Sequence, residues 1–480
     1  MRVADCEQLY RERLDRYTTA MRNEQPDRVP IRPFVAEFTG TYAGYTCQAL
    51  AHDYENAFAA ARRCATDFPW DAVVPNMLAT WTGMTQAMGL RYYMTPGIDL
   101  PPDVGHQYYE PPPEEAWMKP GEYDALIEDP TGFLYNVWFP RVSEPLSPIG
   151  GPVTFEHNLT LIRGSMAMMR FFQAWGVQEQ RLRDECGMPS AIAGMLRAPL
   201  DFIADKLRGY LGLVDDLLEQ PDKVLAACEA LMPYLTQFAL DTADPNKNVP
   251  IGFWMHRGCV PFISFDHFQN IFWPTLKPIV QELWAHGHQT LFYAEGNWDH
   301  HLGAFAELPE RSIVYHIDQG DVRQVQQVLG DRFCLSGGLS NYLLGFRTPA
   351  EVRQACKQLI QSVGRDGGYI MDASAIIQRD AKVENIRAMT EATLEYGVYS
   401  RGHCRCDSPR GAPRPTESEA TPGEFVSHDV GRRLPGVCTP WSEKRRSLPP
   451  IQGDESLCER IWQSVDAMAA SYIWWIAMAF

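Results

Sequence analysis

Polar and aromatic side chains gather directly after one apolar run of the sequence. The run TLFYA, residues 290–294, has the composition of a buried strand, and Glu295, Asn297 and Trp298 follow it. A carboxylate at the end of a buried strand is costly unless a cation, a metal or hydrogen-bond donors match its charge. Glu295 is therefore the first candidate for chemistry, either as a general acid with a raised pKa or as a metal ligand.

Other apolar runs of the chain end in the same way. His256 and Asp318 each follow an apolar run, and His316 lies inside the second of these runs. We assign catalysis to Glu295, His256 and Asp318. Imidazole and carboxylate are common zinc ligands, so Glu295, His256 and His316 form the zinc hypothesis. Substrate contacts are expected from five residues at or near the strand ends: Asn76, Tyr293, Asn297, Trp298 and Asp372.

Each of these residues also has a purely structural explanation. A histidine on an apolar strand, such as His316, is often a core residue with satisfied hydrogen bonds, and His256 can bond a neighbouring loop. The nearby aromatic residues can be core residues, or can suit an apolar methylated substrate and exclude water. His300 and His301 are expected farther along the loop, at the surface or behind the site.

The elements that must position these side chains alternate between strands and helices. Apolar runs of strand length are separated by stretches with the 3.6-residue period of helices, most regularly from residue 249 onward. Continuous apolar strands are typical of a parallel sheet that is buried on both faces. Some eight such units, with no glycine-rich dinucleotide motif after the first strand, favour a (β/α)8 barrel over an open sheet. The carboxyl ends of its strands would carry the active site.

We expect the barrel to occupy residues 1–400, with a helix at its start. It should include a Pro-rich, acidic insertion at about residues 97–150. Four aromatic residues of this insertion should be buried: Trp117, Tyr123, Trp138 and Phe139. Residues 401–436, rich in Pro, Ser and Gly, are expected to be a flexible insertion. Residues 437–480 are expected to form a helical extension that packs on the barrel.

Composition excludes several classes of partner. A formal charge of −17 argues against nucleic-acid binding, because phosphate contacts require clustered Lys and Arg. The apolar C-terminal tail is shorter than the ~20 residues that a membrane span needs, so it should dock on the body or contribute to a homodimer. The twelve cysteines and the absence of an N-terminal apolar signal indicate reduced thiols in the cytoplasm.

Three stretches of the sequence resemble the uroporphyrinogen decarboxylase superfamily. They are AMRNEQPDRVPIRPF at 20–34, GDRFCLSGGLSNYLLGFRTPAEV at 330–352 and GGYIMDASAIIQRDAKVENIRAMTEATLEYG at 367–397. With weaker similarity between them, the resemblance covers about residues 15–400. It implies a (β/α)8 barrel, in agreement with the pattern of elements. The superfamily contains porphyrinogen decarboxylases and corrinoid-dependent methyltransferases.

The residues that mark the decarboxylases are absent. Those enzymes bind substrate carboxylates with an Arg-Gln-Ala-Gly-Arg motif after the first strand, where this chain offers only Arg32. An aspartate at their second strand end binds the pyrrole NH groups, where this chain has Asn76 or the poorly placed Asp71. A substrate with many carboxylates would also meet an acidic chain. A decarboxylase-type lyase is therefore only an alternative to the main prediction.

The zinc thiolates of the methyltransferase branch are absent too. That branch typically holds zinc with a His-x-Cys pair and a later cysteine, and here Tyr293, Glu295 and Ser374 stand at those positions. A related group in anaerobes resembles this chain more, through MKPGEYDALIEDP at 118–130 and the Pro-Trp-x-Glu-Lys stretch at 440–444. Its members are thought to take a methyl group from an ether or amine and pass it to cobalt.

The resemblance therefore implies a demethylating methyltransferase of anaerobic metabolism. It would move a methyl group from a small methoxy or methylamine compound to the cobalt of cobalamin, carried by a separate corrinoid protein. Glu295 would protonate the leaving group or bind a metal that does so. A barrel that binds a small molecule without catalysis is the second alternative, because missing thiol ligands fit it as well.

Overall fold

The computed structural model describes residues 3–74, 78–147, 151–399 and 434–479. Asn76 and residues 401–433 of the expected flexible insertion lie outside these described residues. Within the described part of the chain, no helix is long and apolar enough to cross a membrane.

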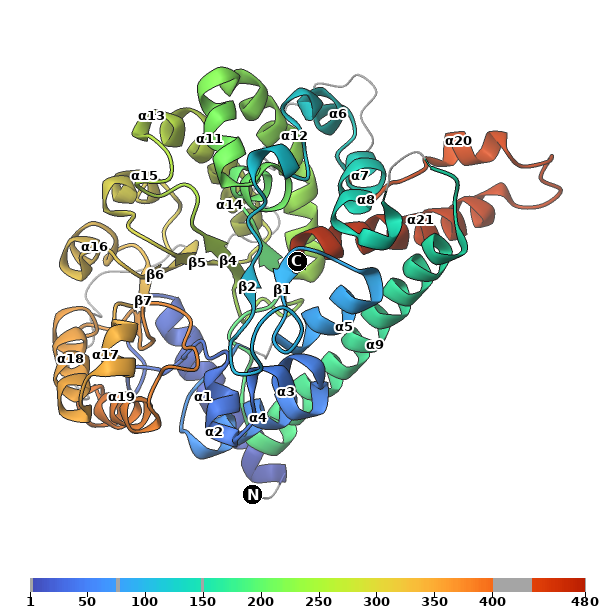
Figure 1. The fold of residues 1–480 in the computed structure, drawn as a ribbon. Helices are drawn as coiled ribbons and strands as arrows, with labels where there is room; N and C mark the ends of the chain where they lie inside the picture. Colours follow the sequence, from blue (N-terminus) through green and yellow to red (C-terminus); the bar gives the residue numbers. More distant parts are fainter. Residues whose placement is uncertain (1–2, 75–77, 148–150, 400–433, 480) are drawn as a thin grey trace.

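A parallel sheet of six strands forms the centre of the molecule (Figure 1). Each strand pairs with the one that follows it in the chain, as the βαβ pattern predicts. The strands are β3 (Met195–Leu196), β4 (Ile251–Met255), β5 (Thr290–Ala294), β6 (Ile313–Ile317), β7 (Cys334–Gly337) and β8 (Tyr369–Ile370).

Two further extended segments close this sheet into a ring. Ile31 pairs in parallel with Met371, beyond β8, and Val73 pairs in parallel with Ser190, before β3. The backbone N–H of Asp71 donates to the carbonyl of Ile31 at 2.8 Å, which joins the two segments to each other. The ring confirms the predicted (β/α)8 barrel. The sequence pattern did not identify β3, because it is only two residues long and lies in a region rich in helices.

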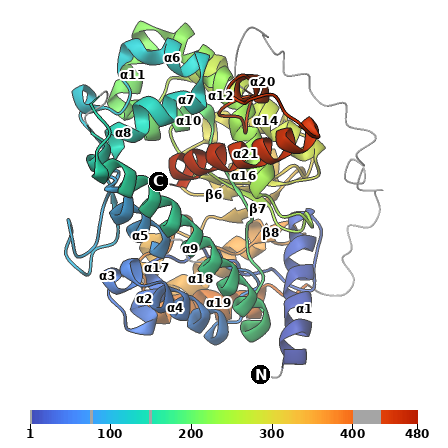
Figure 2. The same cartoon turned by 90° about the vertical axis from the view of Figure 1, so that its right-hand side faces the viewer.

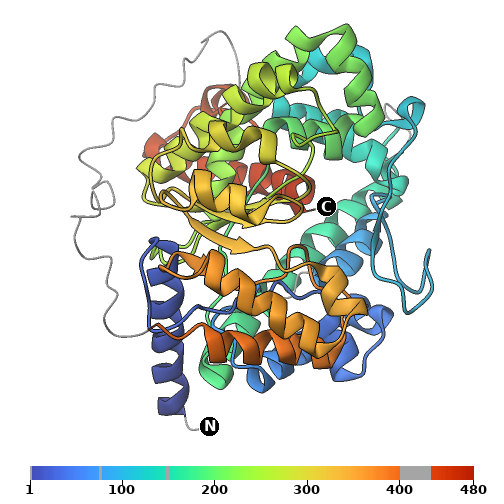
Figure 3. The same cartoon turned by 90° about the vertical axis from the view of Figure 1, so that its left-hand side faces the viewer.

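Helices surround the strands on the outside (Figure 3). The main ones are α1 (Val3–Met21), α4 (Tyr54–Asp67), α5 (Leu78–Met88), α9 (Phe155–Cys186), α11 (Tyr210–Glu219), α12 (Pro221–Thr242), α14 (Trp273–Ala285), α16 (Val322–Leu329), α18 (Pro349–Ser362) and α19 (Val383–Tyr396). The first helix, α1, contacts the ring through the buried Tyr17, whose hydroxyl donates to the carbonyl of Ala191 at 2.8 Å.

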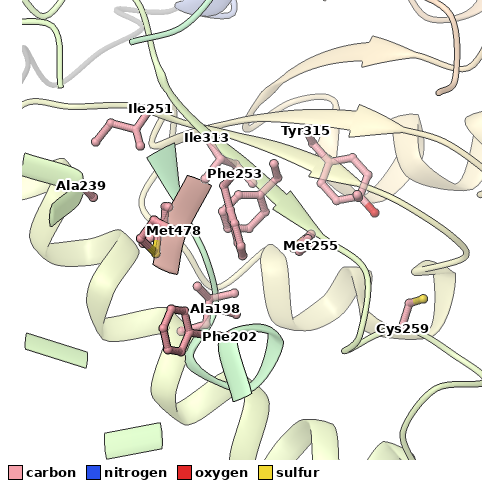
Figure 4. Packing of buried hydrophobic residues seen from close by; sticks show 14 of the residues in the cluster. Ala198, Phe202, Ala239, Ile251, Phe253, Met255, Cys259, Ile313, Tyr315 and Met478 are labelled. Carbon is pink, nitrogen blue, oxygen red and sulfur yellow. The ribbon is translucent and has the colours of Figure 1, made fainter. Parts of the chain in front are cut away.

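Side chains alternate between the two faces of each strand, which fixes what the barrel interior contains. Ile251, Phe253 and Met255 of β4 pack outward with Ala198 and Phe202 (Figure 4). The residues between them, Gly252 and Trp254, face inward, and Trp254 joins an interior cluster with Phe34 and Tyr293. The next inward position after Trp254 is residue 256, and the same alternation applies to β5 and β6.

The acidic insertion folds onto the barrel as a hairpin followed by short helices. The hairpin pairs β1 (Tyr93–Met94) with β2 (Gln107–Tyr108), and α6 (Tyr123–Glu128) packs against α12. The four aromatic residues expected to be buried are all buried: Trp117, Tyr123, Trp138 and Phe139. Burial of these rings explains why so Pro-rich a segment is ordered.

The C-terminal residues form α20 (Trp441–Arg446) and α21 (Glu455–Ala479). The last turns of α21 are buried, and Trp474 lies in a cluster with Phe202 and Tyr234. Its indole N–H also donates to the Thr131 hydroxyl at 3.0 Å, so this helix bridges the barrel helices and the insertion. Figure 2 shows α21 and α9 crossing the same side of the molecule.

Asp71 is the polar group that joins the first two barrel segments to α1. Its fully buried carboxylate pairs with Arg16 at 2.7 Å and Arg28 at 2.8 Å, and it accepts the backbone N–H of Ile31 at 2.8 Å. Asp71 lies at the start of its segment, at the end of the barrel opposite the strand carboxyl ends, so it has a structural role.

We expect Asp71→Ala to lower the free energy of unfolding by about 3–5 kcal/mol, because it leaves two arginines without their buried partner. Urea denaturation followed by circular dichroism measures the change. Asp124→Ala is the control, because it breaks only an exposed pair with Lys223 and should cost less than ~1 kcal/mol. Equal losses in the two variants would contradict the assignment.

Candidate active site

Three residues predicted to be catalytic lie together at the carboxyl ends of neighbouring strands. His256 follows β4, Glu295 follows β5 and Asp318 follows β6, all at inward positions of the alternation. The Nδ1 atom of His256 lies 3.5 Å from Oε2 of Glu295. The backbone N–H of Gly296 donates to Oδ2 of Asp318 at 2.8 Å, which joins the second and third strand ends.

A fourth residue, Asp205, organises this group. Its buried carboxylate lies 3.0 Å from Nε2 of His256 and accepts hydrogen bonds from Arg197 at 3.0 Å and Arg257 at 2.9 Å. It belongs to a π-helical turn, Ile203–Arg208, beyond β3. Local sequence patterns predicted neither Asp205 nor β3. The available signal was a pair of acids, Asp201 and Asp205, inside an otherwise apolar stretch.

The charges of this group follow from burial and proximity. Burial alone would raise the pKa of Asp205, but His256, Arg197 and Arg257 outweigh burial and hold it well below its usual range. Burial would lower the pKa of His256, but Asp205 reverses this and raises it to about 9. At neutral pH, His256 is therefore protonated and Asp205 is ionised.

The pKa of Glu295 is shifted in the opposite direction from the pKa of Asp205. Burial raises its pKa, the charge of His256 counteracts this in part, and Asp318 adds to the increase. The pKa of Asp318 is itself raised by burial. Glu295 and Asp205, on either side of the His256 imidazolium, thus have pKa values displaced in opposite directions. This is the arrangement of an acid and a stabilising base.

The loop after β5 sets the direction of the Glu295 side chain. Gly296 has a φ of +89°, and a Cβ there would lie 2.7 Å from Sγ of Cys259, so this position requires glycine. The indole N–H of Trp298 donates to the carbonyl of Glu295 at 2.8 Å, and the Asn297 amide oxygen accepts the backbone N–H of Asp299 at 3.0 Å. These two side chains shape the loop.

Two residues of this loop lie deeper than the sequence indicates. Trp298 is buried and packs against Phe272 and Phe305, on the side of the helices. His301 was expected at the surface or behind the site, but it is buried and stacks on Phe268 with ring centroids 3.7 Å apart. Aromatic packing between the loop and the helix layer fixes both rings.

His316, Tyr293 and Asp372 lie inside the barrel, deeper than the Glu295–His256 pair. The ring of His316 stacks on Tyr293 at 4.0 Å, and its two nitrogens bond the Ser336 hydroxyl at 2.9 Å and the Ser374 carbonyl at 3.0 Å. Burial lowers the pKa of His316 far below its usual value, so the ring is neutral. These contacts fit the purely structural explanation, a core histidine with satisfied hydrogen bonds.

Asp372 holds the first barrel segment from the inside. Its Oδ1 accepts the backbone N–H groups of Phe34 and Ala373, and its Oδ2 lies 3.4 Å from the buried guanidinium of Arg32. Burial raises the pKa of Asp372 to about 7, and Arg32 opposes this increase. Arg32 also donates to the Ser336 hydroxyl at 3.0 Å. It is therefore enclosed and paired in the barrel, and does not face the strand ends.

The residues of the zinc hypothesis do not fit a zinc ion in this arrangement. Both nitrogens of His316 are bonded within the barrel, so of the three proposed ligands only Glu295 and Nδ1 of His256 face each other. A zinc ligand must be a neutral imidazole with a free nitrogen. Among the residues that the structure describes, no group of three or more His, Cys, Asp or Glu could hold a metal ion.

A cavity of about 1080 Å³ lies elsewhere, between α1, α9, α12 and α21. It touches the barrel interior at Val74, Ile192 and Trp254, but Glu295 and His256 do not line it. We therefore place the candidate active site at Glu295, His256 and Asp205, and not in this cavity.

Comparisons with known proteins agree with the barrel. Residues 179–396 match the family model for uroporphyrinogen decarboxylase (URO-D), a range that includes Asp205, His256 and Glu295. The fold is similar to that of a solved methyltransferase from Methanosarcina mazei, with a TM-score of 0.53 and 16% sequence identity. That similarity covers 79% of this chain and 98% of the other. A comparison with curated proteins finds no match.

The raised pKa of His256 makes its contribution to stability depend on pH. Because its folded-state pKa is about 9 and its unfolded value is ~6.5, the contribution is fully present below pH ~6.5 and is lost as the pH rises through about 9. We expect His256→Gln to cost about 2–3 kcal/mol at pH 6 and much less at pH 10.

Urea denaturation of both proteins at each pH measures this difference. His300→Gln is the control, because His300 is exposed in the neighbouring loop and should give no pH-dependent difference. A cost of His256→Gln that is the same at both ends of the pH range would show that His256 is not held protonated by Asp205.

Proposed function

We propose that the chain is a methyltransferase of the uroporphyrinogen decarboxylase superfamily, whose family model matches residues 179–396. It takes a methyl group from a small methoxy compound and transfers it to the cobalt of a corrinoid that a separate protein carries. The similarity to the Methanosarcina mazei methyltransferase supports the fold on which this proposal depends. The observation that carries it is the position of Glu295 at a strand end, with its Oε2 atom 3.5 Å from Nδ1 of His256, where burial raises the pKa of Glu295.

The reaction requires a proton at the leaving oxygen. The methyl carbon forms a bond to cobalt with the electron pair that cobalt supplies, and the carbon–oxygen bond breaks with its pair left on oxygen. An alkoxide or phenoxide is a poor leaving group unless it is protonated as it forms. Protonated Glu295 donates that proton, and the products are the methylated corrinoid and the free alcohol or phenol.

His256 and Asp205 make Glu295 suited to this step. After donation, the Glu295 carboxylate lies 3.5 Å from the charged His256 ring, which stabilises it. Asp205 keeps His256 protonated throughout, because its own charge is balanced by Arg197 and Arg257. The acid therefore has a raised pKa before donation and a stabilised carboxylate after it, without any change at Asp205.

The same charges favour an ether over a methylated ammonium compound as the methyl donor. In the proposed reaction Glu295 acts in its acid form beside an imidazolium, and this pair would offer no negative charge to a cationic amine. The hairpin residues Tyr92, Tyr93 and Tyr108 pack edge to face with centroids 4.9–6.3 Å apart, and Tyr93 lies near enough for Glu295 to affect its pKa. Such rings suit a methoxylated aromatic compound and keep water from the acid.

Decarboxylation of a porphyrinogen has less support. Its substrate carries many carboxylates and needs cations at the mouth of the barrel. The two described arginines near Glu295, Arg197 and Arg257, are bound to Asp205, and Arg32 is enclosed in the barrel. A barrel that only binds a small molecule would not need displaced pKa values on two carboxyl groups.

We expect Glu295→Gln to lower the rate of methyl transfer by about 10²–10⁴-fold, because glutamine cannot donate the proton. The assay mixes the protein with reduced cobalamin and a panel of methoxylated aromatic and methylamine compounds, and follows the absorbance of cobalamin and the demethylated product. The wild-type rate should fall as the pH rises through the raised pKa of Glu295, and the variant should lack this dependence.

Glu307→Gln is the matched control, because Glu307 is an exposed carboxylate that pairs with Lys277. It should leave both the rate and its pH dependence unchanged. Failure of every compound to methylate cobalamin, free or bound to a corrinoid protein, would refute the proposal. Release of carbon dioxide from a porphyrinogen would favour the lyase instead.

A further inference from the structure

The cavity between α1, α9, α12 and α21 has the volume of a large ligand site. It encloses about 1080 Å³, and ligand sites usually enclose about 300–1,000 Å³. Figure 2 shows α1, α9 and α21 on one side of the molecule. Asn248 and Val249, which precede β4, line the cavity, so it lies at the end of the barrel opposite the strand carboxyl ends.

Aromatic rings from three helices form much of the cavity wall. Trp475 of α21 packs on Phe172 of α9 and on Phe238 of α12, with ring centroids 4.6 Å and 5.0 Å apart. Trp175 packs on Phe171, one turn earlier on α9, at 5.5 Å. Because these rings hold one another in place, a ligand meets a wall that is already formed.

A layer of aromatic rings separates the cavity from the candidate active site. Trp254 of β4 lines the cavity and packs on Phe34 and Tyr293, with ring centroids 5.6 Å and 6.3 Å away. Trp254 and Tyr293 lie two residues before His256 and Glu295, so they form the next layer of the barrel interior toward the cavity. The cavity is therefore a site of its own.

The wall of the cavity carries a net negative charge. Five carboxyl side chains line it: Glu7, Glu179, Asp184, Asp241 and Asp244. Arg183 is the one lysine or arginine among the described residues that line it, and it pairs with Glu7 at 3.1 Å. Asp244 accepts three backbone N–H groups of the turn that follows it. The remaining carboxyl groups exceed what Arg183 can balance.

Glu179 brings a carboxyl group next to the aromatic wall. The indole of Trp175, one turn earlier on α9, donates a hydrogen bond to it. Burial raises the pKa of Glu179, and this hydrogen bond opposes the increase. A ligand cation beside Glu179 would also oppose the effect of burial and keep the carboxylate ionised.

The wall already holds one cation of its own. The guanidinium of Arg183 lies over the ring of Tyr10, 4.7 Å from its centroid, and pairs with Glu7. A ring face together with a carboxylate is the combination that attracts organic cations. A neutral apolar ligand would leave the carboxylates of the cavity without a partner, and an anion would be repelled by them.

We propose that this cavity binds an organic cation, namely an amine or quaternary ammonium group attached to an apolar body. The aromatic rings contact the apolar body and the face of the cation, and Glu179 balances its charge from α9. Asp241 adds negative charge from α12. The proposal is independent of the reaction assigned to Glu295, because neither Glu295 nor His256 lines the cavity.

Calorimetric titration of the full chain with phenyltrimethylammonium tests the proposal. tert-Butylbenzene is the neutral control, because it has the same shape without the charge. We expect the cation to bind on the order of 10-fold more tightly than the neutral compound. Glu179→Gln should weaken binding of the cation about 5–10-fold and leave the neutral compound unchanged. Glu229→Gln, at an exposed position of α12 outside the cavity, should bind both compounds as the wild type does.

Two further variants show where the cation binds. Asp241→Asn repeats the charge test from α12, and Glu295→Gln should bind the cation as the wild type does, with circular dichroism as the check on folding. Absence of cation binding at millimolar concentration overturns the proposal, as does equal binding of the two compounds. Loss of binding in Glu295→Gln, with full binding in Glu179→Gln and Asp241→Asn, places the cation in the active site and also overturns it.

Discussion

The buried carboxylate of Asp205 is the constraint on which the mouth of this barrel depends. An ion in a low-dielectric interior is tolerated only when cations and donors surround it. Here the cations come from the chain after β3 and after β4, as Arg197, His256 and Arg257. The backbone carbonyl of the same residue accepts the hydroxyl groups of Tyr92 and Tyr108. One residue thus holds two strand ends and the hairpin of the insertion together.

The chemistry follows from that constraint, because Asp205 determines the charge of its neighbours. By keeping His256 protonated, it places a fixed positive charge beside Glu295. Burial then raises the pKa of Glu295, while the cations around Asp205 hold the pKa of Asp205 below its usual range. In the proposed reaction, this single buried aspartate therefore separates two similar side chains into a stabilising anion and an acid.

The parts added to the barrel serve this site from two sides. The insertion contributes tyrosines that cover the Asp205 turn, and its buried Trp138 donates to the carbonyl of Lys206 in the same turn. The end of α21 supports the outer side of this region through Trp474, which packs on Phe202.

The sequence by itself determined the barrel and the strand ends. Continuous apolar runs, helical periods and the position of Glu295 after TLFYA depend on local patterns, and strand alternation then brings Glu295, His256 and Asp318 to one end. Only the tertiary structure decided which side chains pair with these strand-end residues. Asp205 is 51 residues from His256, in a turn that follows a two-residue strand with no pattern of its own. His316 is also a histidine, but it lies one layer deeper in the barrel interior than His256. Burial there keeps its ring neutral, and its nitrogens bond the Ser336 hydroxyl and the Ser374 carbonyl. Burial and long-range pairing determine which side chains are charged, and the local spacing of residues in the sequence predicts neither of them.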